Sequence, residues 1–403
     1  MNNDERGRLK AEHGSELKRW GVSVFVFWSL LVGSWPGLNV LESEGLPSFR
    51  SSFSVPRSAF AAEPTERHLA NIRQLTVGRK NAEAYFSFDG TKLIFQSTND
   101  WSDQRGDQPI SMPASSPKGL GCYQMYVMDL VTETIRMVST GVGATTCGYF
   151  FPGDRRVLFS STHPVSPQCP PAPKREGKYR WALDDYDIFA MRVDGQGVHR
   201  LTHSRGYDAE ATIAPDGKTI VYTSLMGGDL DLYAMDLDGQ HVRRLTTEVG
   251  YDGGAFFSPD SKRIVYRASH PTDQAALAEY QALLKQNLVE PSHLEIFVMN
   301  ADGSNKRQVT QNGASNFAPF FHPDGRRIMF SSNVGQTGSV DGPPTFHLYL
   351  VNDDGTGLEP ITTQGHFNSF PMFSPDGKKL VWVSDRGTKE RGEFNLFLAD
   401  WVP

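Results

Sequence analysis

The sequence predicts an all-β fold: a six-bladed β-propeller with four-stranded antiparallel blades, its ring closed by the N-terminal strand. Three observations support this prediction. A short motif recurs six times, each copy is accompanied by two further strand patterns, and the two ends of the repeat region lack complementary strands. Repeats of about 40–45 residues that contain short strands are typical of propeller blades.

The first 61 of the 403 residues contain a predicted membrane-targeting segment and no copy of the repeat. Lys18 and Arg19 precede the uncharged apolar segment Gly21–Leu41. The small-x-small pattern Ala59–Ala61 follows, as in a signal-peptidase site. We interpret residues 1–61 as a signal peptide with linker, or as a retained membrane anchor that tethers the chain. Either interpretation predicts a periplasmic or other extracytoplasmic location. A buried core helix is the third interpretation of the apolar segment.

The recurring motif is an apolar strand, a tight turn and a second strand, as in GYDAEATIAPDG at Gly206–Gly217. Pro-Asp-Gly sequences favour tight turns, and the apolar positions on either side are those of buried strands. The shortest repeat is 44 residues long, from Asp216 to Asp260, and the other repeats carry insertions. The six equivalent turn positions are Asp89, Gly153, Asp216, Asp260, Asp324 and Asp376.

Each repeat has two further predicted strands. The third strand is an IYxM-like run, at 125–128, 188–191, 232–235, 296–299, 348–351 and 396–399. The fourth strand is an RxLT-like run, at 73–76, 136–139, 200–202, 244–246, 307–310 and 359–362. Asp-Gly pairs between the two runs suit a hairpin, because these residues tolerate positive φ.

The order of these runs predicts how the ring closes. The repeat region begins with an RxLT run, Arg73–Thr76, and ends with an IYxM-like run, Leu396–Ala399. Pairing the two completes a sixth blade and removes the exposed edges of an open sheet. We therefore expect one propeller over residues 69–403.

The FSPDG, IYxMNxDG and RQLT runs resemble the repeats of TolB-type six-bladed propellers. This resemblance covers about residues 69–403. It implies a periplasmic protein that binds the peptidoglycan-associated lipoprotein Pal, within the Tol-Pal system that maintains the envelope. TolB proteins also carry a folded domain before the propeller that Ala62–His68 cannot supply, so the resemblance does not extend to binding TolA. Related repeats occur in oligopeptidase propellers and in oligogalacturonate lyases.

The start of each inner strand is the candidate binding site. A residue with a side-chain oxygen stands eight positions before each turn: Asn81, Thr145, Asp208, Asp252, Asn316 and Asn368. Two positions later stand Glu83, Cys147, Glu210, Gly254, Ala318 and Phe370, which we expect on the same strand face. The six oxygen-bearing residues and Glu210 would form a polar ring at one channel mouth. The ring either caps backbone donors and holds water, or receives a basic or amide-rich peptide end.

A cation is a further candidate ligand of this ring. Calcium takes six to eight oxygen ligands, which the ring residues could supply. The sequence identifies no other metal or cofactor, and we otherwise expect none.

Four insertions follow the second strands of their blades and should rise from one face of the propeller. The third insertion predicts a helix that is capped by Thr272. Its apolar stripe is Leu277, Tyr280, Leu284 and Leu288. Cys122 ends the first insertion and Cys169 lies in the second, so adjacent blades could join them in a disulfide; two free thiols are the alternative. Cys147 belongs to an inner strand. The insertions span 99–121, 162–185, 269–293 and 334–345.

The sequence favours binding over catalysis. It contains no GxSxG or HExxH motif, and two residues after Trp401 leave no room for an oligopeptidase hydrolase domain. A metal-assisted polysaccharide lyase would need histidines over the channel. Of the candidates His322, His347 and His366, two look structural from their position in the repeat. A net charge of −6 gives no electrostatic reason to bind nucleic acid.

We therefore expect an exported, non-catalytic and monomeric binding module. Its partner would be an envelope protein or peptide, such as a Pal-like lipoprotein. A metal-assisted polysaccharide lyase or a carbohydrate-binding propeller is the alternative.

Overall fold

The computed structural model describes residues 66–101, 119–173, 179–335, 344–388 and 390–403. The apolar segment Gly21–Leu41 and the pattern at Ala59–Ala61 lie outside the described residues. Within the described ranges, no helix is long and apolar enough to cross a membrane.

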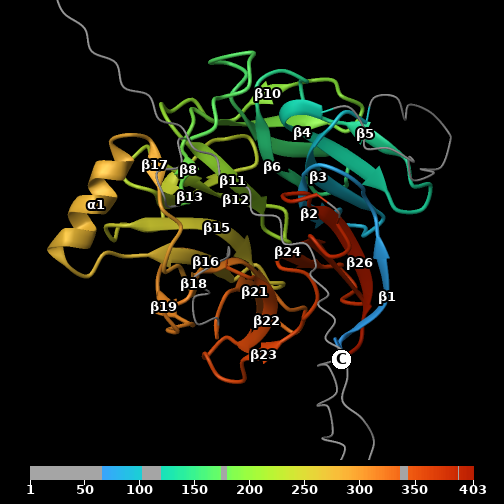
Figure 1. Ribbon diagram of the computed structural model, residues 1–403. Helices are drawn as coiled ribbons and strands as arrows, with labels where there is room; N and C mark the ends of the chain where they lie inside the picture. The colour runs from blue at the N-terminus through green and yellow to red at the C-terminus, as the bar shows by residue number, and fades with distance from the viewer. Residues whose placement is uncertain (1–65, 102–118, 174–178, 336–343, 389) are drawn as a thin grey trace, which may run out of the picture. The chain divides into compact units, whose positions relative to one another are not determined.

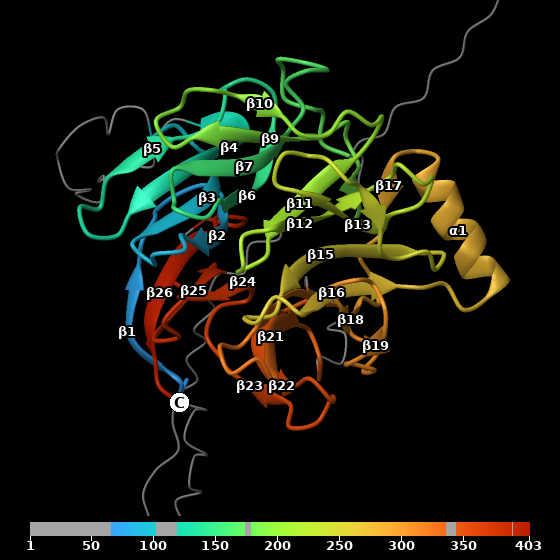
Figure 2. The same ribbon diagram turned by 180° about the vertical axis from the view of Figure 1, so that it is seen from behind.

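Six four-stranded antiparallel sheets are arranged around a common centre, and the predicted fold is confirmed (Figures 1 and 2). The chain runs through the blades in order, and each blade is built from the centre outwards. The inner strands are β2 (Asn81–Phe86), β6 (Thr145–Phe150), β11 (Asp208–Ile213), β15 (Tyr251–Phe257), β20 (Asn316–Phe321) and β24 (Asn368–Phe373). The second strands are β3 (Lys92–Asn99), β7 (Arg156–Ser161), β12 (Thr219–Ser224), β16 (Arg263–Ser269), β21 (Arg327–Ser332) and β25 (Lys379–Ser384).

The outer half of each blade is a second hairpin. The third strands are β4 (Gly119–Asp129), β9 (Asp187–Arg192), β13 (Asp231–Asp236), β18 (Glu295–Asn300), β22 (His347–Asn352) and β26 (Asn395–Trp401). The fourth strands are β5 (Ile135–Met137), β10 (His199–Arg200), β14 (Arg243–Arg244), β19 (Arg307–Gln308), β23 (Glu359–Pro360) and β1 (Leu69–Gln74).

The sixth blade is closed by the two ends of the repeat region. Strand β1 pairs antiparallel with β26, with Arg73 opposite Leu398 and Gln74 opposite Phe397. Backbone bonding continues one residue further, where the amide of Leu75 donates to the carbonyl of Leu396 at 2.8 Å. The N-terminal strand therefore closes the ring, as the order of the sequence runs predicts.

Most fourth strands are shorter than the RxLT runs, because the threonine bonds through its side chain. In blade three, only Arg243 and Arg244 pair in the β-ladder. The hydroxyl of Thr246 then accepts a hydrogen bond from the amide of Leu232, at the start of the third strand, at 2.9 Å. Matching bonds in the other blades are accepted by Thr76, Ser139, Thr202, Thr310 and Thr362.

One aromatic pair recurs in the core of every blade. The fourth residue of each second strand is aromatic and lies opposite an aromatic residue of the third strand. In blade six, Trp382 stacks on Phe397 with ring centroids 5.7 Å apart. Such cross-strand pairs stabilise a sheet beyond the area that they bury. The other pairs are Phe95–Tyr126, Phe159–Phe189, Tyr222–Tyr233, Tyr266–Phe297 and Phe330–Tyr349.

Two insertions add structure to the face where the second strands end, called here the insertion face. The helix α1 (Gln274–Leu284) forms as predicted, but its N-cap is Asp273 rather than Thr272. The Asp273 carboxylate accepts bonds from the amides of Ala275 and Ala276, both at 2.9 Å. A charged acceptor makes stronger bonds to these amides than a hydroxyl does. Strand β17 (Leu288–Val289) pairs with β8 (Trp181–Ala182) and joins the second and third insertions.

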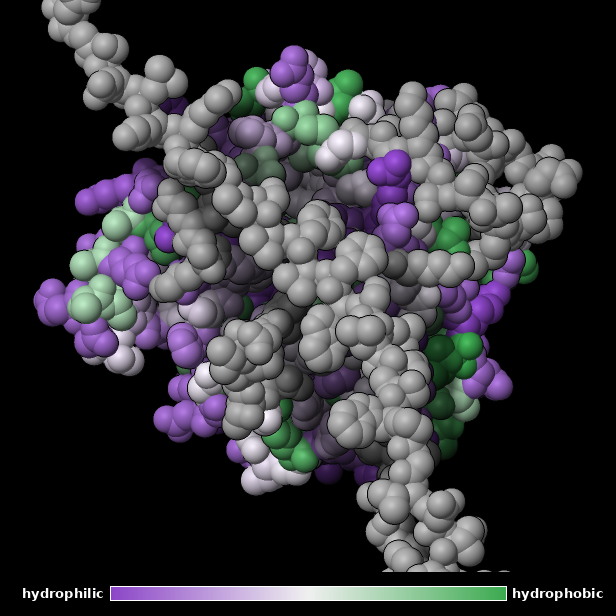
Figure 3. All heavy atoms as spheres, viewed as in Figure 1, coloured by the Kyte–Doolittle hydropathy of each residue, from purple (hydrophilic) through white to green (hydrophobic). Residues whose placement is uncertain are grey.

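The opposite face carries the Pro-Asp-Gly turns and the Asp-Gly hairpins, and is called here the turn face. Figure 3 shows that the described surface in its view is mostly hydrophilic, with smaller hydrophobic areas between.

Candidate binding site at the channel mouth

The six oxygen-bearing residues of the predicted ring lie at or next to the start of each inner strand, but they are at most 1% exposed, whereas the side chain of Glu210 is 14% exposed. They join blades. Asn81 donates to the carbonyl of Phe394 in the adjacent blade at 3.1 Å and accepts from the Ser97 hydroxyl at 2.7 Å. Asn316 makes the same pair of bonds, to Leu294 at 2.9 Å and from Ser332 at 2.7 Å.

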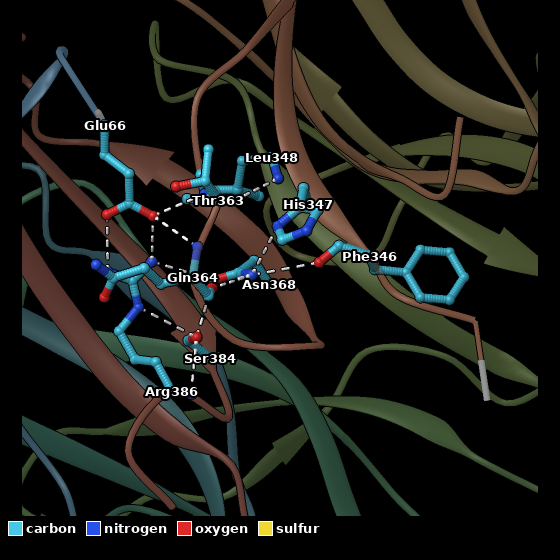
Figure 4. Close-up of polar contacts among 10 residues, drawn as sticks. Glu66, Phe346, His347, Leu348, Thr363, Gln364, Asn368, Ser384 and Arg386 are labelled. Carbon is cyan, nitrogen blue, oxygen red and sulfur yellow. Dashed lines mark hydrogen bonds and ion pairs between the residues drawn. The ribbon is translucent and has the colours of Figure 1, made fainter. Parts of the chain in front are cut away.

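Asn368 shows this arrangement at the junction of blades five and six (Figure 4). Its amide donates to the carbonyl of Phe346 at 3.3 Å, and its oxygen accepts from the Ser384 hydroxyl at 2.8 Å. A hydrogen bond to His347 measures 3.3 Å.

The other three ring residues also have internal partners. Asp208 accepts from the hydroxyls of Ser204 and Ser224, Asp252 pairs with His270 at 3.1 Å, and Thr145 donates to a backbone carbonyl of blade one at 3.3 Å. Burial raises the pKa of both carboxyls above the usual aspartate range. None of the six lines either cavity of the channel described below.

The residues two positions later do line a cavity, together with neighbouring side chains. All six have φ between 50° and 59°, and each lies at a register shift between the inner and second strands. This bulge breaks the strand alternation, so these residues do not share the environment of the ring residues. They are Glu83, Cys147, Glu210, Gly254, Ala318 and Phe370.

The cavity measures about 20 Å³, which is room for about one water molecule. Blade four contributes Arg267 from its second strand. A Cβ atom on Gly254 would lie 2.1 Å from the Arg267 guanidinium, so glycine leaves the space that this arginine fills. Arg267 forms a buried ion pair with Glu210 and donates to the Tyr251 hydroxyl at 2.9 Å.

Glu83 lies in the same cavity and forms no ion pair with any residue that the structure describes. Burial raises its pKa to about 7, and the nearby Glu210 carboxylate adds to the rise, while a hydrogen bond with Cys147 opposes it. Burial also raises the pKa of the Cys147 thiol well above its usual value. The cavity therefore offers a carboxyl that can exchange its proton near neutral pH beside a protonated thiol.

Aromatic rings surround this mouth and fill the channel beneath it. Phe370 lines the cavity and packs against Phe317, and Trp181 packs against Tyr251. Deeper in the channel, Tyr85, Tyr149, Phe256 and Phe320 pack together, with centroids of neighbouring rings 5.3–6.3 Å apart. A second cavity of about 220 Å³ opens beyond them, lined by phenylalanines and the prolines of the turns.

The three histidines considered for a lyase do not assemble at the mouth. His322 follows β20 and packs against Phe373 and Trp401. His347 begins β22, and the ring of His366 is exposed beside Asp385. Among the described residues, no group of three or more His, Cys, Asp or Glu side chains is placed to hold a metal ion.

The structure joins Cys122 and Cys169 by a disulfide, with Cα atoms 5.6 Å apart. The bond links β4, directly after the first insertion, to the second insertion. Cys147 remains a free thiol within β6.

The described residues form a closed six-bladed propeller with a small polar cavity and aromatic rings at one mouth. Within it, residues 181–289 and 282–396 match the TolB beta propeller domain. These matches together cover more than half of the chain, which belongs to this family.

The individual relatives match only in part. An uncharacterized protein, Atu1656 of Agrobacterium fabrum, is 33% identical over 90 residues, which are 22% of this chain and 28% of that protein. A TolB homolog of Chlorobium luteolum is 27% identical over 128 residues, 23% of this chain and 29% of that protein. The aligned segments thus span less than a third of these curated relatives.

The solved structure of a putative TolB from Agrobacterium tumefaciens has a TM-score of 0.51 at 18% identity. The alignment covers 81% of this chain and 92% of that one, and this likeness supports the fold alone. An oligogalacturonate lyase in complex with manganese has a TM-score of 0.44 at 14% identity; the alignment covers 82% of this chain and 93% of that one.

Proposed function

We propose that this protein is an exported, non-catalytic binding module that engages a protein or peptide partner at the cell envelope. Its contact surface is the mouth of the central channel on the insertion face. The observation that carries the proposal is the small polar cavity beside aromatic rings. Its volume of about 20 Å³ suits the end of one side chain or of a peptide, and not a sugar ring.

The chemistry of the mouth also favours a protein partner. Half-buried aromatic side chains such as Phe370 and Trp181 resemble the residues that dominate binding energy in protein interfaces. The carboxyls of Glu83 and Glu210 outnumber the single Arg267, so the cavity suits a basic or amide-rich group. Family membership makes a Pal-like lipoprotein the first partner to test. The module acts as a monomer in the periplasm, either free or tethered through Gly21–Leu41.

The test is affinity capture from a detergent extract of the cell envelope by the full-length protein. We expect Phe370→Ala to reduce capture of a Pal-like lipoprotein at least about tenfold, as loss of an aromatic contact does at an interface centre. Alanine suits this backbone position, since Ala318 occupies it in blade five with φ 51°. Val242→Ala, which trims an exposed apolar residue between β13 and β14, is the matched control.

Equal capture by the wild-type and Phe370→Ala proteins would exclude the mouth as the contact surface. Metal analysis of the same sample tests the alternatives. A stoichiometric metal without any protein partner would replace this proposal with a polysaccharide lyase. Stoichiometric calcium together with the partner would instead add a structural ion to the binding module.

A further inference from the structure

A second polar cluster lies at the junction of blades five and six, where the segment before β1 meets the propeller (Figure 4). The Glu66 carboxylate accepts bonds from the amides of Thr363 at 2.8 Å and Gln364 at 3.2 Å. Both of its oxygens also accept from the Arg386 guanidinium, at 3.0 Å each. Four donors thus converge on a single carboxylate.

The propeller makes further contacts with the arginine of this cluster. The Arg386 side chain is 9% exposed, and its guanidinium lies 5.0 Å from the ring centre of Trp382 and 5.5 Å from that of Phe397. It also donates to the Asn368 oxygen at 3.3 Å. A planar, fixed guanidinium beside two backbone amides matches the geometry of a carboxylate.

A comparison with blade four shows why Arg386 pairs with a carboxylate from outside blade five. In blade four, Glu295 begins the third strand and accepts from the amides of Asn312 and Gly313, both at 3.1 Å. His347 begins the third strand of blade five, and burial lowers its pKa. A neutral imidazole cannot balance the charge of Arg386. Glu66 supplies the missing negative charge from a distant part of the chain.

We propose that Arg386 and the amides of Thr363 and Gln364 form a carboxylate-binding site, and that Glu66 is its intramolecular ligand. The segment that leads into the propeller is thereby latched to the insertion side of blade six. When Glu66 is removed, the site takes a free carboxylate. This inference is independent of the proposed function.

Neighbouring contacts strengthen the latch. Arg67 and His68 both bond to Glu359 of the fifth blade, at 2.9 Å each, and His68 also bonds to the carbonyl of Val402. Three consecutive residues thus attach the segment to blades five and six. Loss of Glu66 alone should open the carboxylate site while these contacts keep the neighbouring backbone in place.

The test is chemical rescue of Glu66→Ala in the full-length protein. This substitution removes the volume of an acetate ion and leaves the buried charge of Arg386 unpaired. We expect sodium acetate to raise the melting temperature of the variant by at least about 2 °C relative to sodium chloride at equal ionic strength. Wild-type protein and the exposed-site control Glu133→Ala should show no such difference.

Hydrogen exchange gives a second, local measurement. In Glu66→Ala, the peptide that contains Thr363 and Gln364 should exchange on the order of tenfold faster, and acetate should slow it again. Adding Arg386→Met should abolish both effects of acetate. Equal melting temperatures and equal exchange in acetate and chloride would overturn the proposal. If Glu66→Ala does not fold in chloride, its refolding yield decides: folded protein recovered in acetate but not in chloride supports the proposal, and equal yields in the two salts overturn it.

Discussion

At the scale of residues, the structure separates two sets of inner-strand residues: the six ring residues and the six residues two positions later. The alternation of a regular strand would place both sets on the same face. Asn81 and Glu83 are two positions apart, so a regular strand would direct both side chains to one face. The register shift between Ala82 and Tyr85, with Glu83 at φ 50°, places Asn81 between blades and Glu83 in the cavity. Both sets could be found from the repeat, but a local bulge decides which set lines the cavity.

Glu83 should make stability fall as pH rises. Its pKa is about 7 in the folded protein and near 4.5 in the unfolded chain, so the folded state holds the extra proton between these values. The contribution is complete below pH 4.5 and is lost as pH rises through 7. Its size is roughly 3 kcal/mol.

Glu83→Gln should remove this dependence. The measurement is the free energy of unfolding in urea at pH 5.0 and at pH 7.5. The exposed-site variant Glu133→Gln is the control. The Glu83→Gln variant should lose less stability between the two pH values than the wild type does. Parallel losses in the variant and the wild type would show that another group is responsible.

At the scale of elements, the RxLT run is a strand followed by a side-chain cap. Its pattern predicts the element correctly, but not that only its first residues join the ladder. The threonine hydroxyl takes over because it satisfies a buried amide at the start of the third strand, as Thr246 does for Leu232. The strand pattern does not reveal a side-chain bond of this kind.

Thr246→Val should destabilise the protein by about 1–3 kcal/mol. Valine keeps the shape of threonine but leaves the buried amide of Leu232 without an acceptor. Thr247→Val, at the exposed neighbouring position, is the control and should change stability by less than about 0.5 kcal/mol. Urea unfolding compares the three proteins. Equal midpoints for both variants would mean that the cap contributes nothing.

At the scale of the whole molecule, closure through β1 makes six sheets into one ring. Without β1, strand β26 would expose an unpaired edge, and the amide of Leu396 would lose the Thr76 hydroxyl, which lies 2.9 Å away. Closure should therefore govern both stability and solubility.

Removing residues 1–76 should lower the melting temperature by at least about 10 °C and promote self-association, compared with removing residues 1–65. The shorter deletion retains β1 and Glu66. Circular dichroism melting and size-exclusion chromatography measure the two effects. A protein without β1 that melts like its control and stays monomeric would contradict the role of this strand.

The sequence by itself determined the blade number, the strand order, the closing pair and the face that carries the insertions. These features depend on local patterns that repeat along the chain, so each copy supports the others. Tertiary structure alone decided which side chains line the channel, that Arg267 fills the space beside Gly254, and that Glu66 supplies the charge absent at His347. The first depends on a backbone bulge that recurs in every blade but that the alternation of residue types does not show. The other two join residues far apart in sequence through single contacts. No periodic pattern records such contacts, because each occurs once and depends on how the blades meet.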